Sequence, residues 1–195
     1  MTGVVLAGGR STRMGTNKAL LEFDGVPIIE RVLAALRPLF RELAIVANDP
    51  EPYAYLHLPI WPDRLPGKGP LGGLYTAVSN SAFSQSFCMA CDMPFANRAI
   101  IQYLTQLAHA VDVVVPRTPD GYQPLHAVYS KTCLGPMESL LTANRLKIDH
   151  LFPAVRVRVV EEAELRRLDP LQCAFINVNT RQDLDSASAL AREAA

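Results

Sequence analysis

The sequence predicts a three-layer α/β/α fold in which helices cover both faces of a mainly parallel sheet. Short apolar runs alternate with segments of helical periodicity along most of the chain, which is the pattern of strand–helix–strand units. One run, residues 111–115, consists of β-branched valines apart from Asp112, which is typical of a strand covered on both faces. The chain has 195 residues, 49% of them hydrophobic, so one domain over residues 1–195 can bury a core without disulfides or structural metal.

The N-terminal part begins with a predicted buried strand at residues 3–7, followed by an extended piece at 20–24 that turns at Asp24-Gly25. A helix is predicted next because apolar residues recur at helical spacing, with Pro27 in its first turn and Pro38 at its end. The apolar positions of this helix are Ile28, Ile29, Val32, Leu33 and Leu36. Residues 43–47 form the second predicted strand.

A proline-rich surface segment, residues 49–73, follows and leaves room for one short strand near 58–61. Later helices are predicted at 71–79, 97–108, 136–143, 146–152 and 180–191, the last with Thr180 and Asp183 placed as a capping pair. Later strands are predicted at 86–90, 111–115, 125–129, 155–160 and 175–178, with 155–160 as an exposed or edge strand. Residues 116–123 are expected to form a turn-rich link.

Composition excludes some classes of partner. The formal net charge is zero, so no general positive field attracts nucleic acid or an anionic membrane surface. No apolar run approaches the roughly 18 residues of a membrane-spanning helix, and the chain starts without a signal-like segment. The four cysteines show no regular framework, so we expect a soluble protein of the reducing cytoplasm.

Two of the cysteines, Cys88 and Cys91, have the C-x-x-C spacing that redox and zinc sites use. No second cysteine or histidine pair at ligand spacing accompanies them, and they lie in an apolar run that is typical of a buried strand. We therefore predict that they pack in the core.

A glycine-rich loop directly follows the first predicted strand. Residues 6–18 read Leu-Ala-Gly-Gly-Arg-Ser-Thr-Arg-Met-Gly-Thr-Asn-Lys. Glycines let backbone N–H groups approach an anion and point at it, while Arg10, Arg13 and Lys18 supply positive charge. This pattern predicts a nucleoside triphosphate site. The loop is not a Walker A sequence, because Gly15 and Lys18 are not adjacent and no Ser or Thr follows the lysine.

Polar residues also follow other predicted strands. In open α/β sheets the ligand binds at the carboxyl ends of the strands, which here are followed by Asn48, Asp63 and Asp92. Asp92 is stiffened by Pro94, and a carboxylate at a strand end is a natural ligand for Mg²⁺ beside phosphate oxygens. A helix cap or turn residue is the structural alternative for Asp92.

Two further motifs are interpreted as structural. Residues 67–72 satisfy G-x-G-x-x-G, but several residues, with Pro62 and Pro66 among them, separate this run from the strand before it, so we regard the dinucleotide fingerprint as accidental. His126 lies in a predicted strand and pairs with no nucleophile in the sequence, so we predict a structural histidine whose hydrogen bonds are satisfied.

Taken together, the motifs closely resemble those of the molybdenum cofactor guanylyltransferases, which have a Rossmann-like nucleotidyltransferase fold. The resemblance covers nearly the whole chain. The motifs that carry it are residues 6–15 with Lys18, Gly69-Pro-Leu-Gly-Gly-Leu74, Cys91-Asp-Met-Pro94, Gln123-Pro-Leu-His-Ala-Val-Tyr129 and Phe175-Ile-Asn-Val-Asn-Thr180. The first is shared by many sugar and cofactor nucleotidyltransferases, whereas the ordered set is specific to the family.

The resemblance implies transfer of GMP from GTP to the terminal phosphate of molybdenum-bound molybdopterin, with release of pyrophosphate. It also implies catalytic roles for Lys18, Arg13 and Asp92, with Mg²⁺ held by Asp92. The nucleotide contacts that it implies are Leu6, Ala7, Gly8, Gly9, Lys18, Asn48, Asp63, Gly69 and Asp92. Gly8-Gly9 and Gly69-Pro70-Leu71 favour GTP over CTP. Asn177, Asn179 and the turn 116–122 are expected near the second substrate, because they follow late strands.

Other functions stay open at this point. A cytidylyl or sugar-phosphate nucleotidyltransferase would use the same fold, an NAD-dependent oxidoreductase would use the Gly67 loop, and a non-catalytic module would bind nucleotide without releasing pyrophosphate. The expected partners are GTP and molybdenum-bound molybdopterin, with transient contact to molybdoenzymes or other cofactor-biosynthesis proteins. Neither nucleic acid nor a membrane is expected as a partner.

Overall fold

The computed structural model describes residues 1–8, 17–178, 183 and 186. Its strands are β1 (Thr2–Leu6), β2 (Glu22–Phe23), β3 (Val26–Pro27), β4 (Glu42–Val46), β5 (Ile60–Trp61), β6 (Gln85–Ala90), β7 (Val113–Thr118), β8 (Gly121–Tyr122), β9 (His126–Ser130) and β10 (Val157–Val160). Its α-helices are α1 (Ile28–Leu36), α2 (Gly69–Asn80), α3 (Arg98–Gln106), α4 (Leu134–Thr142) and α5 (Glu162–Leu165). Short 3-10 helices are Lys18–Leu20, Glu51–Leu56, Leu107–Ala110, Lys131–Cys133 and Ile148–Ala154.

The central sheet is mostly parallel, as predicted, with the strand order β10-β7-β9-β6-β1-β4-β5. β1 pairs in parallel with β4 on one side and with β6 on the other, β4 pairs in parallel with β5, and β7 with β10. β9 is antiparallel to both β6 and β7, and β8 forms a hairpin with β7. The chain reverses its direction of winding at β1, so the switch point lies beside the glycine-rich loop.

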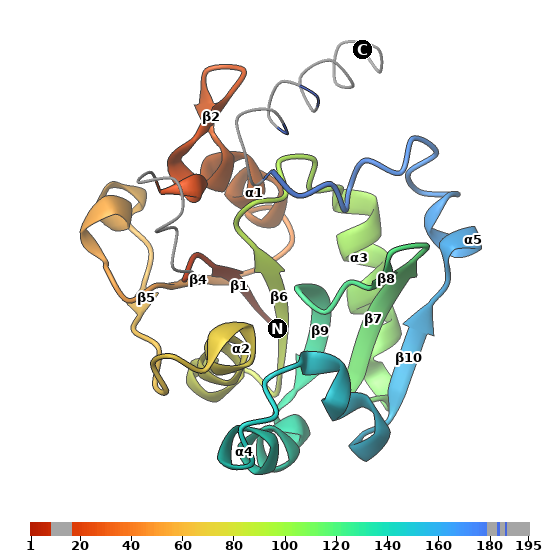
Figure 1. Cartoon of the computed structure of the whole chain (residues 1–195). Coiled ribbons are helices and arrows are strands. Elements are labelled where there is room, and N and C mark those ends of the chain that lie inside the picture. The colour runs from red at the N-terminus through yellow and green to blue at the C-terminus, as the bar shows by residue number, and fades with distance from the viewer. Residues whose placement is uncertain (9–16, 179–182, 184–185, 187–195) are drawn as a thin grey trace.

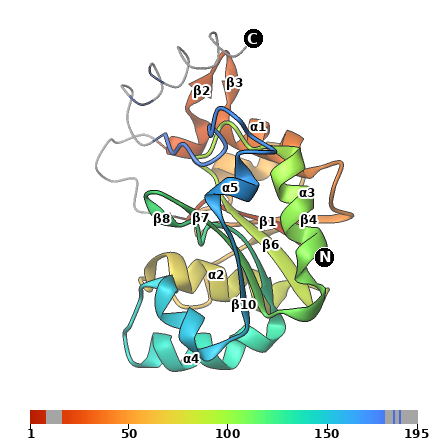
Figure 2. The ribbon, with the colours of Figure 1, turned by 90° about the vertical axis from the view of Figure 1, so that its right-hand side faces the viewer.

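Helices cover both faces of this sheet, which confirms the three-layer prediction (Figures 1 and 2). α1 and α3 pack on one face and α2 and α4 on the other. Successive residues of β1 serve different layers: Val5 belongs to the core under α1 and α3, while Val4 and Leu6 belong to the core under α2 and α4. This alternation is the reason why the strand is apolar throughout. Among the described residues, no helix is both long enough and apolar enough to cross a bilayer.

The predicted strand at 175–178 does not form. Its backbone groups are satisfied elsewhere: the Val178 N–H donates to the Asp92 carbonyl (2.8 Å), and the Ile176 N–H closes a turn onto Cys173 (3.0 Å). The segment 175–178, called the strap below, therefore crosses the strand ends as irregular backbone instead of forming a further strand. Apart from residues 183 and 186, the predicted helix at 180–191 lies outside the described residues. So do Thr180 of its capping pair, Gly9, Arg10, Arg13, Gly15 and Asn179.

Smaller differences concern prolines and turns. Pro27 is the last residue of β3 and precedes α1 instead of lying in its first turn. The predicted helix at 146–152 is a 3-10 helix that contains Pro153. Residues 116–118, which were predicted to belong to a turn-rich link, form the end of β7. A proline can lie in this strand because β9 pairs with β7 only at Val113 and Val114, so β9 accepts no hydrogen bond from position 116.

The two cysteines of the C-x-x-C motif pack as predicted. Cys88 lies in the core under α2 and α4, and Cys91 packs against the core on the other face. Burial raises the pKa of both thiols, that of Cys91 to about 12, so neither is a ready thiolate. No group of three or more potential metal ligands of the His, Cys, Asp and Glu types occurs within the part of the chain that the structure describes.

His126 is structural, but the prediction that its hydrogen bonds are satisfied is wrong. The side chain is fully buried, and neither ring nitrogen has a hydrogen-bond partner among the described residues. The ring packs between two aromatic rings, with centroid distances of 5.4 Å to Phe87 and 5.0 Å to Phe175. Burial lowers the pKa of His126 to about 3. Aromatic packing thus takes the place that polar partners would have had.

This histidine gives a prediction for stability against pH. The unfolded chain binds a proton at His126 near pH 6.5, whereas the folded chain does so only near pH 3, so the native state loses stability as the pH falls through this window. Between pH 7.5 and pH 5 the loss is about 2 kcal/mol, from about 1.4 kcal/mol per pH unit. His126→Phe is expected to remove this dependence, as measured by urea unfolding at both pH values. The exposed His109→Gln variant is the control, and equal slopes for His126→Phe and wild type would contradict the prediction.

Candidate nucleotide site at the carboxyl edge of the sheet

The strand ends that the sequence singled out form one row at the carboxyl edge of the sheet. β6, β1, β4 and β5 are parallel neighbours, and backbone hydrogen bonds continue the ladder past their ends. These bonds join the amide of Cys91 to the carbonyl of Leu6 (3.2 Å), Ala7 to Val46 (2.9 Å) and Ala47 to Trp61 (3.1 Å). The structure therefore brings together Asp92, Ala7 with Gly8, Asn48 and Asp63, in that order along the edge.

Asn48 and Asp63 organise the β4–β5 end of this row. The Asn48 side chain accepts a hydrogen bond from the Asp63 N–H (2.9 Å). One oxygen of Asp63 in turn accepts from the Leu65 N–H (3.1 Å) and lies 3.1 Å from the Thr76 hydroxyl on α2. The hydroxyl of Thr76 also accepts from the Arg64 N–H (2.9 Å). The loop after β5 is thereby tied to the middle of α2, and Thr76 is a supporting residue that sequence reasoning did not identify.

The glycines at the start of α2 allow the helix to approach the strand ends. Gly69 begins the helix with a φ of 61°, in the left-handed region that favours glycine. At Gly73 a Cβ would already contact Leu6 at 3.9 Å, and at Gly72 it would lie only 3.1 Å from the Leu65 carbonyl oxygen. Several turn residues separate β5 from α2, so residues 67–72 do not form the tight strand-to-helix turn of a dinucleotide fingerprint.

Asp92 follows β6 and has the electrostatic character of a cation ligand. Its Oδ1 atom is buried and has no hydrogen-bond partner among the described residues. Burial raises the pKa of Asp92, while a backbone N–H and the charge of Lys18 act in the opposite direction. A buried carboxylate oxygen that no described donor satisfies is a costly group unless a cation binds there. The residues present therefore fit a divalent ion that takes its other ligands from phosphate and water.

Lys18 stands close enough to Asp92 and Cys91 for its charge to lower the pKa of both. It is the first residue of the 3-10 helix Lys18–Leu20, which Asn17 caps by accepting from the Ala19 N–H (3.2 Å). The structure thus places the lysine that closes the glycine-rich loop beside the acidic residue after β6. The predicted site residues Gly9 and Arg13 lie outside the described residues.

A cavity of about 460 Å³ lies at the same edge of the sheet, next to the end of β7. Its lining includes Thr118 at the end of β7, Pro119 and Asp120 from the turn that follows, and Phe175, Ile176 and Asn177 from the segment 175–178. The hydrogen bond from Val178 to the Asp92 carbonyl fixes the strap beside the β6 end. Asn177 and the turn 116–122, which the sequence assigned to one substrate, therefore meet in one cavity.

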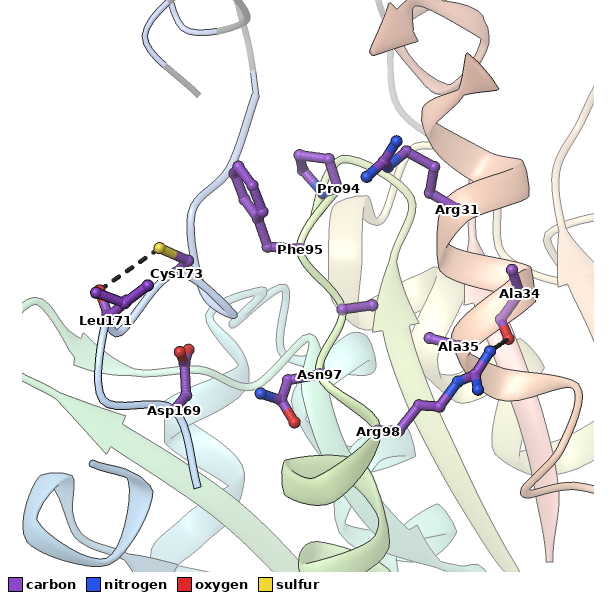
Figure 3. A pocket seen from close by; sticks show the side chains of 11 residues that line it. Arg31, Ala34, Ala35, Pro94, Phe95, Asn97, Arg98, Asp169, Leu171 and Cys173 are labelled. Carbon is purple, nitrogen blue, oxygen red and sulfur yellow. Dashed lines mark hydrogen bonds between the residues drawn. The ribbon is translucent and has the colours of Figure 1, made fainter. Parts of the chain in front are cut away.

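A second cavity, of about 510 Å³, holds none of the predicted site residues (Figure 3). It lies between α1 and residues 169–173, and the segment from Pro94 to Asn97 forms its floor. Arg31 and Arg98 reach it from α1 and α3, and Arg98 donates to the Ala34 carbonyl (2.8 Å). In the loop after β6, Asp92 therefore lies at the carboxyl edge of the sheet, whereas Pro94 lines this second cavity.

Comparison with known proteins agrees with this geometry. Residues 3–159 match the MobA-like NTP transferase domain. A protein of Pelotomaculum thermopropionicum, described as a probable molybdenum cofactor guanylyltransferase, is 43% identical over 97% of this chain and 93% of its own length. The molybdenum cofactor guanylyltransferase of Desulfosudis oleivorans is 36% identical over 97% of this chain and 95% of its own length.

Similarity extends to solved structures. The crystal structure of molybdopterin-guanine dinucleotide biosynthesis protein A from Archaeoglobus fulgidus superposes with a TM-score of 0.84 at 26% identity, covering 99% of this chain and 100% of that one. Fold, sequence and the row of strand-end residues lead to the same assignment. The chain belongs to the MobA-like NTP transferase family and is a nucleotidyltransferase.

Proposed function

We propose that this nucleotidyltransferase transfers GMP from GTP to the terminal phosphate of molybdenum-bound molybdopterin in the cytoplasm, giving the guanine dinucleotide cofactor and pyrophosphate. The observation that carries the proposal is the buried Asp92 oxygen, which has no hydrogen-bond partner among the described residues. It lies beside Lys18 and between two groups of predicted substrate residues. On one side lie Leu6, Ala7, Gly8, Asn48, Asp63 and Gly69, and on the other the cavity with Asn177. The names of the relatives supply the choice of substrates.

The reaction requires positioning more than proton transfer. A phosphate oxygen of the acceptor attacks the α-phosphorus of GTP, and the bond from that phosphorus to the bridging oxygen of the β-phosphate breaks, so pyrophosphate leaves with the electron pair. The attacking group is already an anion and needs no general base. The site has to hold two polyanions in line and to neutralise the charge that grows on pyrophosphate.

The residues divide this work among them. The main chain at Leu6, Ala7, Gly8 and Gly9 would face the phosphates, and Asn48 and Asp63 would contact the nucleoside side. Gly69 would be a further nucleotide contact. Lys18 and Arg13 place positive charge on the triphosphate. Asp92 would hold Mg²⁺, which supplies Lewis-acid stabilisation of phosphate oxygens when bound.

Formation of pyrophosphate tests the proposal. The purified protein is incubated with Mg²⁺ and molybdenum-loaded molybdopterin, together with GTP in one arm and CTP in another. A third arm replaces the pterin with a sugar phosphate, and binding of GTP and of NAD is titrated in parallel. Release with GTP that depends on the pterin is expected. Release of pyrophosphate with CTP but not with GTP, or only with a sugar phosphate as acceptor, would identify a related nucleotidyltransferase instead. Binding of GTP without any release would identify a non-catalytic module, and tight binding of NAD without binding of GTP an oxidoreductase.

Asn177 offers a prediction on the second substrate. It is exposed and lines the same cavity as Asp120, so we expect its amide, with that of Asn179, to hydrogen-bond the pterin. Asn177→Ala should raise the KM for molybdenum-loaded molybdopterin about fivefold to tenfold, which corresponds to one lost hydrogen bond. The KM for GTP in the same variant is the internal control. A change in the KM for GTP with none in that for the pterin would contradict this placement.

A further inference from the structure

Tyr53 is a buried tyrosine that the predicted chemistry does not use. It lies in the 3-10 helix Glu51–Leu56, in the proline-rich segment beside β5, and its side chain is 2% exposed. Burial raises the pKa of Tyr53, so the hydroxyl keeps its proton and can donate. A buried hydroxyl group requires hydrogen-bond partners, and the residues that supply them indicate what Tyr53 does.

The partners of Tyr53 lie near the two ends of the glycine-rich loop. Its hydroxyl lies 3.3 Å from the carbonyl oxygen of Ala7, directly after β1. The Tyr53 hydroxyl oxygen itself accepts a hydrogen bond from the Asn17 side-chain amide (2.9 Å). The hydroxyl proton has the Asn17 Oδ1 as a second possible acceptor, at 3.1 Å. Ala7 and Asn17 are ten positions apart in sequence, and one hydroxyl group connects them.

The contacts form a consistent chain of donors and acceptors. The Ala19 N–H donates to Asn17 Oδ1 (3.2 Å), the Asn17 amide donates to the Tyr53 oxygen, and the Tyr53 hydroxyl donates to the Ala7 carbonyl. Each group is used in its ordinary sense. This series of hydrogen bonds begins at the Ala19 amide, next to Lys18, and ends at Ala7, the first residue after β1. It therefore fixes Lys18 relative to the Ala7 main chain.

We propose that Tyr53 is a positioning residue for the triphosphate, because its hydroxyl fixes the distance between the Ala7 main chain and Lys18. The inference rests on the proposed function in that it assigns these two groups to phosphate binding. It predicts an effect on the triphosphate alone, since Asn48 and Asp63 hold the nucleoside side through contacts that do not involve Tyr53.

The test compares GTP with guanosine, each titrated by calorimetry in the presence of Mg²⁺. Tyr53→Phe removes only the hydroxyl and is expected to weaken GTP binding about tenfold, the scale of a lost hydrogen bond, with guanosine binding unchanged. Tyr103→Phe is the matched control: it loses a hydroxyl that is bonded to Glu164 (2.8 Å) on α5, and its GTP binding should equal that of wild type. Equal loss for GTP and guanosine, or no loss for either, would overturn the proposal.

A double-mutant cycle with Asn17 separates the chain of contacts from a general effect on folding. Asn17→Ser retains a side chain that caps helices well but removes the amide that reaches Tyr53. If Tyr53 and Asn17 act through the same series of hydrogen bonds, the double variant should bind GTP with the same affinity as whichever single variant has the lower affinity. Additive losses would contradict this. If wild type binds CTP and not GTP, the proposed function fails, and the Tyr53 comparison is made with CTP and cytidine.

Discussion

Asp92→Asn is expected to lower turnover about a thousandfold, the upper range for loss of one preorganised electrostatic group in an active site. The amide keeps the shape of the carboxylate but removes the charge that would hold a divalent ion beside the triphosphate. Pyrophosphate release at saturating GTP and Mg²⁺ measures the loss. The affinity for Mn²⁺, followed by electron paramagnetic resonance in the presence of GTP, gives a readout that is independent of the pterin.

The stability of this variant distinguishes loss of function from loss of fold. Burial raises the pKa of Asp92 and its Oδ1 atom has no hydrogen-bond partner among the described residues, so the charge is a cost to folding. Asp92→Asn should therefore unfold at the same or a higher urea concentration than wild type. Asp149→Asn, which breaks a surface ion pair with Lys147 (3.0 Å), is the control for removal of a carboxylate. Full turnover of Asp92→Asn, or unchanged Mn²⁺ affinity, would remove Asp92 from the site.

The sequence indicated Asp92 as a candidate site residue because local and global signals coincide at that position. An apolar run ends there, a proline follows two residues later, and the carboxyl ends of parallel strands share one edge of a sheet. The same argument placed Asn48 and Asp63, and the structure brings all three to one row. The predicted strand preceding Asp92 also matches β6 to within one residue at its start.

Residues whose role depends on distant partners were harder to predict. Tyr53 contacts Asn17 and Ala7 across separations of 36 and 46 residues, from a proline-rich segment without any periodic pattern. The segment 175–178 has the composition of a strand, but the Asp92 carbonyl takes its Val178 amide. His126 was interpreted correctly as structural, while its lack of polar partners results from two aromatic rings far away in sequence. Contacts between residues far apart in sequence determine these features, and the local sequence pattern carries no information about such contacts.

Lys18→Ala is the second variant for which we expect a large effect, a loss of about a hundredfold or more in turnover, by analogy with removal of one preorganised transition-state donor. The ammonium group would neutralise charge as it develops on pyrophosphate, so saturating GTP should not restore the rate. Lys147→Ala, on the exposed surface, is the control for loss of a lysine. Wild-type turnover of Lys18→Ala at saturating GTP would exclude Lys18 from the mechanism.

The pH profile of this variant tests whether the charge of Lys18 controls the protonation of Asp92. Burial raises the pKa of Asp92, and the positive charge of Lys18 opposes that rise. Without the lysine, the pKa of Asp92 should rise further, so a larger fraction of the carboxyl is protonated at a given acidic pH. The residual activity of Lys18→Ala should therefore decline at a higher pH than wild-type activity does on acidification. Lys18→Arg keeps the charge and should leave the acid limb near its wild-type position, although turnover falls because the guanidinium has a different shape.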